Sequence, residues 1–171
     1  MTNLPTHSLR VADLPQSKPS YFELVPDAAA LSAIAQELDL RGLRKLRFKG
    51  KITATGDRDW LLEANLGATV IQNCVVTLEP VTTRLEEPVI RRFLAALPEQ
   101  TEEDEEIEMS EDDSIEALGA EIDPAAVMIE ALALHLPLYP RAEGAVLGET
   151  LHTEPGKEAL SDADLKPFAG L

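Results

Sequence analysis

The sequence predicts an α+β fold: a mainly antiparallel sheet with two packing helices, an acidic mobile excursion and a disordered C-terminal tail. Three observations predict this fold. Apolar and polar residues alternate from Leu46 to Val70, apolar residues recur at helical spacing between Leu31 and Leu38, and a largely apolar helical segment follows Pro124.

Residues 1–20 are polar and rich in proline, which predicts an irregular arm. Residues 21–25 are expected to form a short strand, and Asp27 then begins a helix. Gly42 is expected to end that helix. Four apolar positions predict its buried face: Leu31, Ile34, Ala35 and Leu38.

A period of two then indicates a hairpin around Gly56. The inner face of its first strand is apolar: Leu46, Phe48, Ile52 and Ala54. The inner face of its second strand is apolar as well: Trp60, Leu62, Ala64, Leu66, Ala68 and Val70. The two apolar faces align if the loop has three or five residues.

A third extended stretch, residues 74–93, contains Pro80 and Pro88 and therefore predicts an edge strand or two short strands with a bend. Asp123 and Pro124 give an N-cap followed by proline at the first helical position, so a second helix is expected from there to about residue 136.

The domain organisation follows from composition. Residues 1–140 are expected to form a single α+β domain, within which residues 99–116 are an acidic mobile segment. Residues 107–109 inside that segment are a candidate short strand. Residues 141–171 are expected to be a flexible tail, because large apolar residues are few there.

Composition excludes several classes of protein. Cys74 is the single cysteine, so a secreted disulfide scaffold is excluded. No apolar run approaches the roughly 20 residues that span a bilayer, and the N-terminus lacks the pattern of a secretory signal. We therefore expect a cytoplasmic protein without membrane partners, and the oligomeric state stays open.

The charge is unevenly distributed. The net charge is −16, yet residues 1–92 carry 12 Lys and Arg against 11 Asp and Glu, and the excess of acid lies in residues 93–171. Overall acidity argues against non-specific binding of nucleic acid by the whole molecule. The acidic segment could mimic nucleic acid or hold a basic protein, or it could be a solubilising loop.

A row of cations follows one face of the first hairpin strand and forms the candidate site for RNA or a partner: Lys45, Arg47, Lys49 and Lys51. Alternate residues of a strand point the same way, about 6.7 Å apart, which suits successive phosphates. Two plainer interpretations stay open. The face is solvated, with Lys49 or Lys51 pairing with Glu63 across the hairpin, or the acidic segment folds back onto it.

Residues for catalysis or metal binding are not evident. His7, His135 and His152 have no ligand-like spacing to each other or to Cys74. His135 lies near a helix end, where its ring can meet free carbonyls. Cys74 is surrounded by apolar residues, which favours a packed, inert thiol over a nucleophile. We expect no enzyme activity, no metal and no cofactor.

The order of several motifs resembles the YceD-like proteins, the large ribosomal RNA subunit accumulation family. These motifs are Arg10–Pro15, the run Gln72–Val81, Glu121–Ala125 leading to Leu132–Pro137 and Tyr139–Arg141, and Lys166–Leu171. The resemblance implies a bacterial cytoplasmic protein that is needed for accumulation of large-subunit ribosomal RNA and has no enzymatic activity.

The chain also departs from many relatives of that family. Relatives place a second cysteine three positions after the first, and some add cysteines after the Leu-Pro segment. Here those places hold Thr77 and residues 141–144, so a paired-thiol or metal role does not carry over. Two hypotheses stay open: an assembly factor that binds ribosomal RNA or a pre-ribosomal particle through the basic strand, and an acidic interaction module that chaperones a basic ribosomal protein.

Overall fold

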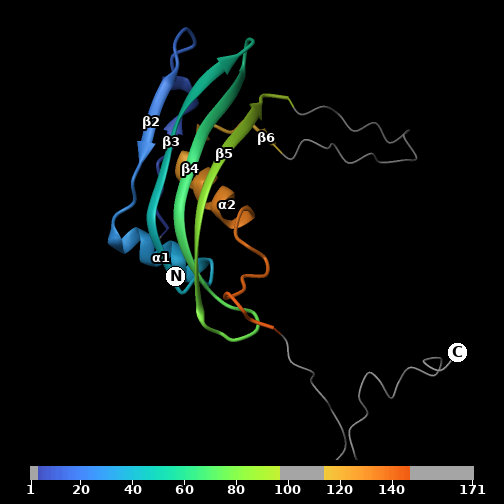
Figure 1. Cartoon of the computed structure of the whole chain (residues 1–171). Coiled ribbons are helices and arrows are strands. Elements are labelled where there is room, and N and C mark those ends of the chain that lie inside the picture. Colours follow the sequence, from blue (N-terminus) through green and yellow to red (C-terminus); the bar gives the residue numbers. More distant parts are fainter. Residues whose placement is uncertain (1–3, 97–113, 147–171) are drawn as a thin grey trace, which may run out of the picture.

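A computed structural model describes residues 4–96 and 114–146, and these residues confirm the predicted α+β fold. A five-stranded sheet has the order β2-β3-β4-β5-β6, antiparallel except for the last pair (Figure 1). Its strands are β2 (Ser20–Leu24), β3 (Gly42–Thr55), β4 (Asp59–Asn73), β5 (Pro80–Leu94) and β6 (Ile115–Ala117).

The hairpin of β3 and β4 forms as predicted. Thr55 pairs with Asp59, so the loop has three residues, and Gly56 takes the positive φ of 70° that glycine allows. The apolar faces of both strands are therefore aligned. The residues of β4 that were expected on the inner face are all buried: Trp60, Leu62, Ala64, Leu66, Ala68 and Val70.

Both predicted helices are present, α1 (Ala28–Glu37) and α2 (Pro124–Leu134). Figure 1 shows α2 behind β4 and β5, so one face of the sheet, here called the inner face, is covered. Ile34 of α1 and Met128 and Leu132 of α2 are buried in one core with the inner residues of the sheet. Leu31 of α1 is partly buried against this core.

The caps explain where the helices begin and end. Asp27 accepts a hydrogen bond from the N–H of Ala30, and Asp123 accepts from the N–H of Ala125, as the sequence predicted. The prediction that Gly42 ends α1 was wrong. Asp39 takes the left-handed conformation after the helix, with φ of 50°, and Gly42 opens β3. Aspartate is one of the residues that tolerates this conformation.

Of the third predicted stretch, residues 80–94 form one continuous strand, β5, whereas residues 74–79 form a turn. β5 pairs with β4 over its whole length, and β6 lies beside only Arg92–Leu94. The N–H of Arg92 points toward β6, where it donates to the carbonyl oxygen of Ser114. Alternate residues of a strand direct their N–H groups to the same side. Pro88 is four residues before Arg92, so its missing N–H would have pointed to this side and not to β4. Proline is tolerated where no ladder hydrogen bond is lost. The remainder of β5 is an edge strand among the described residues, as one of the two alternatives predicted.

The N-terminal arm is more regular than expected. It holds β1 (Leu9–Arg10) and the 3₁₀ turn η1 (Val11–Asp13), and β1 pairs with β7 (Glu121–Ile122). Its apolar residues pack against the core: Leu4, Leu9, Val11 and Leu14. The prediction of an irregular arm was wrong because partners more than 100 residues away order a segment that has no periodicity of its own.

The expectations for the acidic segment fall mostly outside the described residues, as does the candidate strand at 107–109. The segment after Pro140, expected to be a flexible tail, is described as far as residue 146. There the N–H of Ala142 donates to Cys74 Sγ at 3.3 Å, so the beginning of that segment is held against the domain.

Candidate functional site

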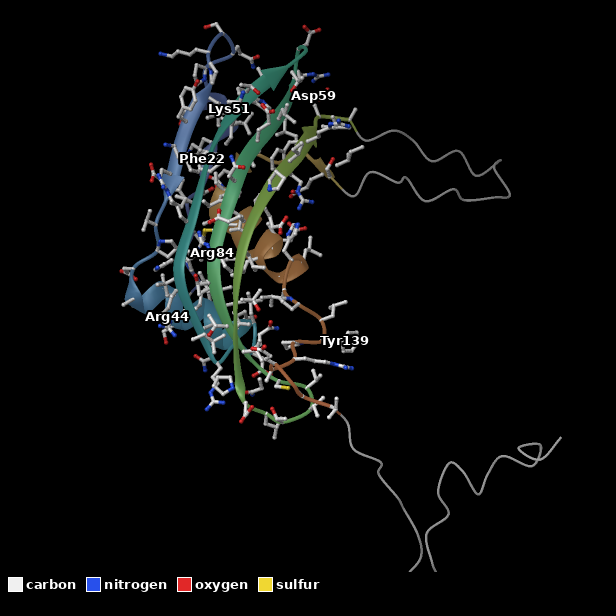
Figure 2. All side chains as sticks on the ribbon, in the orientation of Figure 1. Phe22, Arg44, Lys51, Asp59, Arg84 and Tyr139 are labelled. Atoms are coloured by element: carbon white, nitrogen blue, oxygen red, sulfur yellow. The ribbon has the colours of Figure 1, made fainter. Side chains whose placement is uncertain are left out.

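The predicted basic row lies on the face of the sheet that is turned away from α2, here called the outer face. Leu46, Phe48 and Ile52 are buried, and the alternating cations between them point outward. Figure 2 looks onto this face and shows Lys51, Arg84 and Arg44 distributed along it. No helix of the described part of the chain covers this face.

A β-bulge interrupts the row at Lys45. Arg44 pairs with Thr69 and Arg47 pairs with Gly67, so β3 has one residue more than β4 over this interval. Lys45 has a φ of 51°, which is uncommon for a residue other than glycine. The bulge shifts the phase of the strand, so Arg44 joins the outer face. Regular spacing therefore holds for Arg47, Lys49 and Lys51 and was wrong for Lys45.

Carboxylates of neighbouring strands lie among these cations. Arg47 pairs with Glu23 of β2 at 2.6 Å and Lys49 approaches the same carboxylate at 3.9 Å. Lys51 pairs with Glu63 of β4 at 3.1 Å, which is one of the cross-strand pairs predicted. Ion pairs between exposed side chains contribute at most about 1 kcal/mol, so an incoming anion can replace these carboxylates at little cost.

Arg84 of β5 belongs to the same face, and the sequence did not identify it. Its Nε donates to Glu86 at 2.8 Å, and its Nη1 lies 3.4 Å from both Thr69 Oγ1 and the carbonyl oxygen of Lys45. Arg84 also reaches over Gly67, where an added Cβ would lie 2.8 Å from Arg84 Nη2. The order of the sheet brings this arginine to β3, and nothing in the local sequence indicates it.

A broad, open hollow of about 690 Å³ lies between these side chains on the outer face. Short side chains leave space at its floor, because Asn65 pairs with Pro88 and Gly67 pairs with Glu86 in neighbouring positions of β4 and β5. Cations of β3 and Arg84 of β5 line its sides. The hollow therefore combines a shallow floor with a surplus of positive charge.

Two exposed apolar side chains stand at one end of the hollow. Tyr21, Lys51, Glu63 and Ile90 form one row across four strands, from β2 to β5. Tyr21 is 78% exposed and Ile90 is 52% exposed, and both line the hollow. The sequence analysis placed Tyr21 in a strand without identifying it as part of this face.

Cys74 forms a separate cluster at the end of β4. Its buried Sγ accepts hydrogen bonds from the N–H groups of Val76, Thr77 and Ala142 at 3.3–3.4 Å. Hydrogen bonds, foremost from the Thr77 side chain and next from the Ala142 and Thr77 N–H groups, outweigh burial and lower the pKa of the thiol to about 6. The structure thus brings Thr77 and the segment after Pro140 to one place around the single thiol.

Groups suited to metal binding are not assembled within residues 4–96 and 114–146, where no three His, Cys, Asp or Glu side chains converge. His135 lies at the end of α2, where its Nδ1 is 2.7 Å from the carbonyl oxygen of Ala131, the contact that its position predicted. Over the same ranges, none of the helices has the length and apolarity needed to cross a bilayer.

Comparison with models of protein families relates this chain to known proteins. Neither the curated proteins nor the solved structures contain a match to this chain. A family model described as the large ribosomal RNA subunit accumulation protein YceD matches residues 62–171. This range includes Arg84 and the Cys74 cluster, whereas β3 with its cations precedes it. Because the match covers more than half of the 171 residues, the chain belongs to the YceD family.

Proposed function

We propose that this protein is a non-enzymatic, cytoplasmic ribosome-biogenesis factor that binds ribosomal RNA, free or within a pre-ribosomal particle, through the outer face of its sheet. The family description relates it to accumulation of large-subunit ribosomal RNA. The observation that carries the proposal is the open hollow lined by Arg47, Lys49, Lys51 and Arg84 in a chain whose net charge is −16.

Electrostatics supports this assignment of the face. Around the hollow and the bulge, cations outnumber carboxylates two to one: Arg44, Lys45, Arg47, Lys49, Lys51 and Arg84 against Glu23, Glu63 and Glu86. Such a local surplus in an acidic protein concentrates phosphate contacts on one surface and repels them elsewhere.

A salt titration tests the proposal. If Arg47, Lys49, Lys51 and Arg84, which line the hollow, neutralise four phosphates, the affinity for a single-stranded fragment of large-subunit ribosomal RNA falls with a log–log slope of about −3. The double variant Lys49→Gln and Lys51→Gln should lose about half of that slope. Arg10→Gln with Lys18→Gln is the matched control, because it removes two charges outside the hollow.

A second candidate rests on the charge of the acidic segment. Residues 99–116 hold 11 acidic residues and no basic one, a composition that suits a chaperone for a basic ribosomal protein. Replacing those acids by Gln and Asn should then abolish capture of ribosomal proteins from cells. Absence of RNA binding at low salt, both in the wild type and in a variant that lacks residues 99–113, would favour this candidate over RNA binding.

A further inference from the structure

At one end of the hollow, the row of Tyr21, Lys51, Glu63 and Ile90 places an aromatic ring beside a cation. Tyr21 lies opposite Lys51, and Ile90 closes the row on β5. Neighbouring strands are about 4.8 Å apart, so these two apolar side chains stand roughly 14 Å from each other across the sheet. The ion pair of Lys51 and Glu63 occupies the positions between them, so a nucleobase can reach the exposed ring of Tyr21 only from above the sheet.

The floor of the hollow offers hydrogen bonds as well as space. Asn65 is exposed, and within the described residues its carboxamide has no hydrogen-bond partner. A carboxamide both donates and accepts, as the edges of nucleobases do. Gly67 has no side chain, and Arg84 reaches over it, while Pro88 presents a flat apolar ring on the neighbouring strand.

Exposure of Tyr21 distinguishes this face from a surface that binds phosphates alone. The ring is 78% exposed, while Phe22 and Phe48, the neighbouring aromatic pair, are buried on the inner face. An exposed ring gains little from phosphate contacts but gains substantially from stacking on an unpaired base. In a duplex the base faces are already stacked, and the deep, narrow major groove of A-form RNA keeps side chains from the base edges inside it.

We propose that the hollow binds unpaired bases of single-stranded RNA, with one base stacked on Tyr21 and hydrogen-bonded to Asn65, while cations of β3 hold the adjoining phosphates. This inference rests on the proposed function and specifies its ligand: single-stranded segments of ribosomal RNA rather than helical ones.

The experiment compares one oligoribonucleotide in three forms: single-stranded, paired with its complement, and single-stranded with abasic sites. Because Tyr21→Leu removes the ring on which the base stacks, it should weaken binding of the single strand about tenfold and leave the salt slope unchanged. Tyr21→Phe should keep the affinity of the wild type. Tyr139→Leu is the control, because Tyr139 is 77% exposed and lies outside the hollow, on the segment that follows α2 (Figure 2).

The outcomes separate the inference from the proposed function. The inference would be overturned, and the proposed function kept, by three results together. The single strand, the duplex and the abasic strand bind with equal affinity, Tyr21→Leu does not change the affinity, and the log–log salt slope is near −3. Loss of binding in the abasic strand and in Tyr21→Leu, with an unchanged melting temperature of the variant, supports it. Absence of binding to every form at low salt overturns both.

Discussion

Gly50 determines how closely β3 and β4 approach each other. A Cβ at this position would lie 2.3 Å from the carbonyl oxygen of Glu63 and 2.5 Å from the Cβ of Ala64. Because the first of these neighbours is backbone, the strands themselves would have to separate. Gly50 thus serves the packing of the hairpin, and its φ is not in the left-handed region.

Replacing Gly50 by alanine should lower the free energy of unfolding by about 1–3 kcal/mol, the usual cost of inserting a methyl group into a packed site. Gly119→Ala is the matched control, because its nearest neighbour would be the backbone of Glu121 at 3.7 Å, an ordinary contact. Urea unfolding followed by the fluorescence of Trp60 measures both. Equal midpoints for the two variants would contradict the close approach.

The Cys74 thiol should make stability depend on pH. Its pKa falls from 9.0 to about 6 in the folded protein, so between these values the unfolded chain binds a proton that the folded chain has released. The stabilisation is therefore complete above pH 9, decreases as the pH falls, and is lost below about pH 6. The difference in unfolding free energy between the wild type and Cys74→Ala should grow from pH 6 to pH 9; parallel profiles would show an unperturbed thiol.

At the scale of residues, the sequence predicted the outer face only where the strand is regular. Buried Leu46, Phe48 and Ile52 show which residues of β3 face the core, and the cations between them therefore face outward. The phase of Arg44 could not be predicted, because a bulge depends on pairing with β4. Two adjacent polar residues, Arg44 and Lys45, between Leu43 and Leu46 are the one local sign of the irregularity.

At the scale of elements, β5 combines a paired side and an open side. The N–H of Arg92 faces β6, and the register with β4 has no shift along β5. Residues with even numbers therefore direct their N–H groups to the edge, and residues with odd numbers direct theirs to β4. Pro80 and Pro88 both fall in the even set, where proline removes no hydrogen bond of the ladder.

This alternation predicts opposite results for two neighbouring substitutions. Thr82→Pro removes an N–H at the open edge and should leave the stability close to that of the wild type. Thr83→Pro leaves a carbonyl of β4 without its donor. It should lower the free energy of unfolding by about 1–3 kcal/mol more than Thr82→Pro does. The midpoints of urea unfolding compare the two variants directly. A larger loss of stability for Thr82→Pro would mean that the even-numbered residues of β5 donate the hydrogen bonds to β4.

The long elements were predictable and the short ones were not. Alternation along β3 from Leu46 onward and over the 15 residues of β4 identifies the hairpin, and Asp123 with Pro124 identifies the start of α2. β1 and β7 have two residues each and β6 has three, too few for any period to be visible. Their existence depends on distant partners, so the parallel pairing of β6 was missed. Arg84 was missed for another reason: the order of the sheet, and not a local pattern, brings it close to β3.

At the scale of the whole molecule, the charge of the acidic segment should oppose the RNA binding that we propose for the outer face. Residues 99–113 hold ten acidic residues, more than half of the net charge of −16. Replacing these residues by Gln and Asn should strengthen RNA binding at low ionic strength, and the gain should shrink as salt screens charges beyond about 10 Å at 0.1 M. Fluorescence anisotropy over a salt series measures both effects.

A variant with the same acidic residues in scrambled order is the control for that experiment, because it keeps the charge and should keep the affinity of the wild type. Weaker RNA binding after neutralisation would contradict the electrostatic argument. It would show that the acidic residues support the complex, as expected if a basic protein joins the RNA.

The pairing of β1 with β7 has a consequence for synthesis of the chain on the ribosome. Leu9 pairs with Ile122, and α2, which buries Met128 and Leu132 against the sheet, follows directly. The chain is synthesised at about 5–20 residues per second, so β7 is made roughly 6–20 seconds after β1. During that time the inner face of the β3–β4 hairpin lacks its helical cover, so completion of the core is a late event that the emergence of α2 controls.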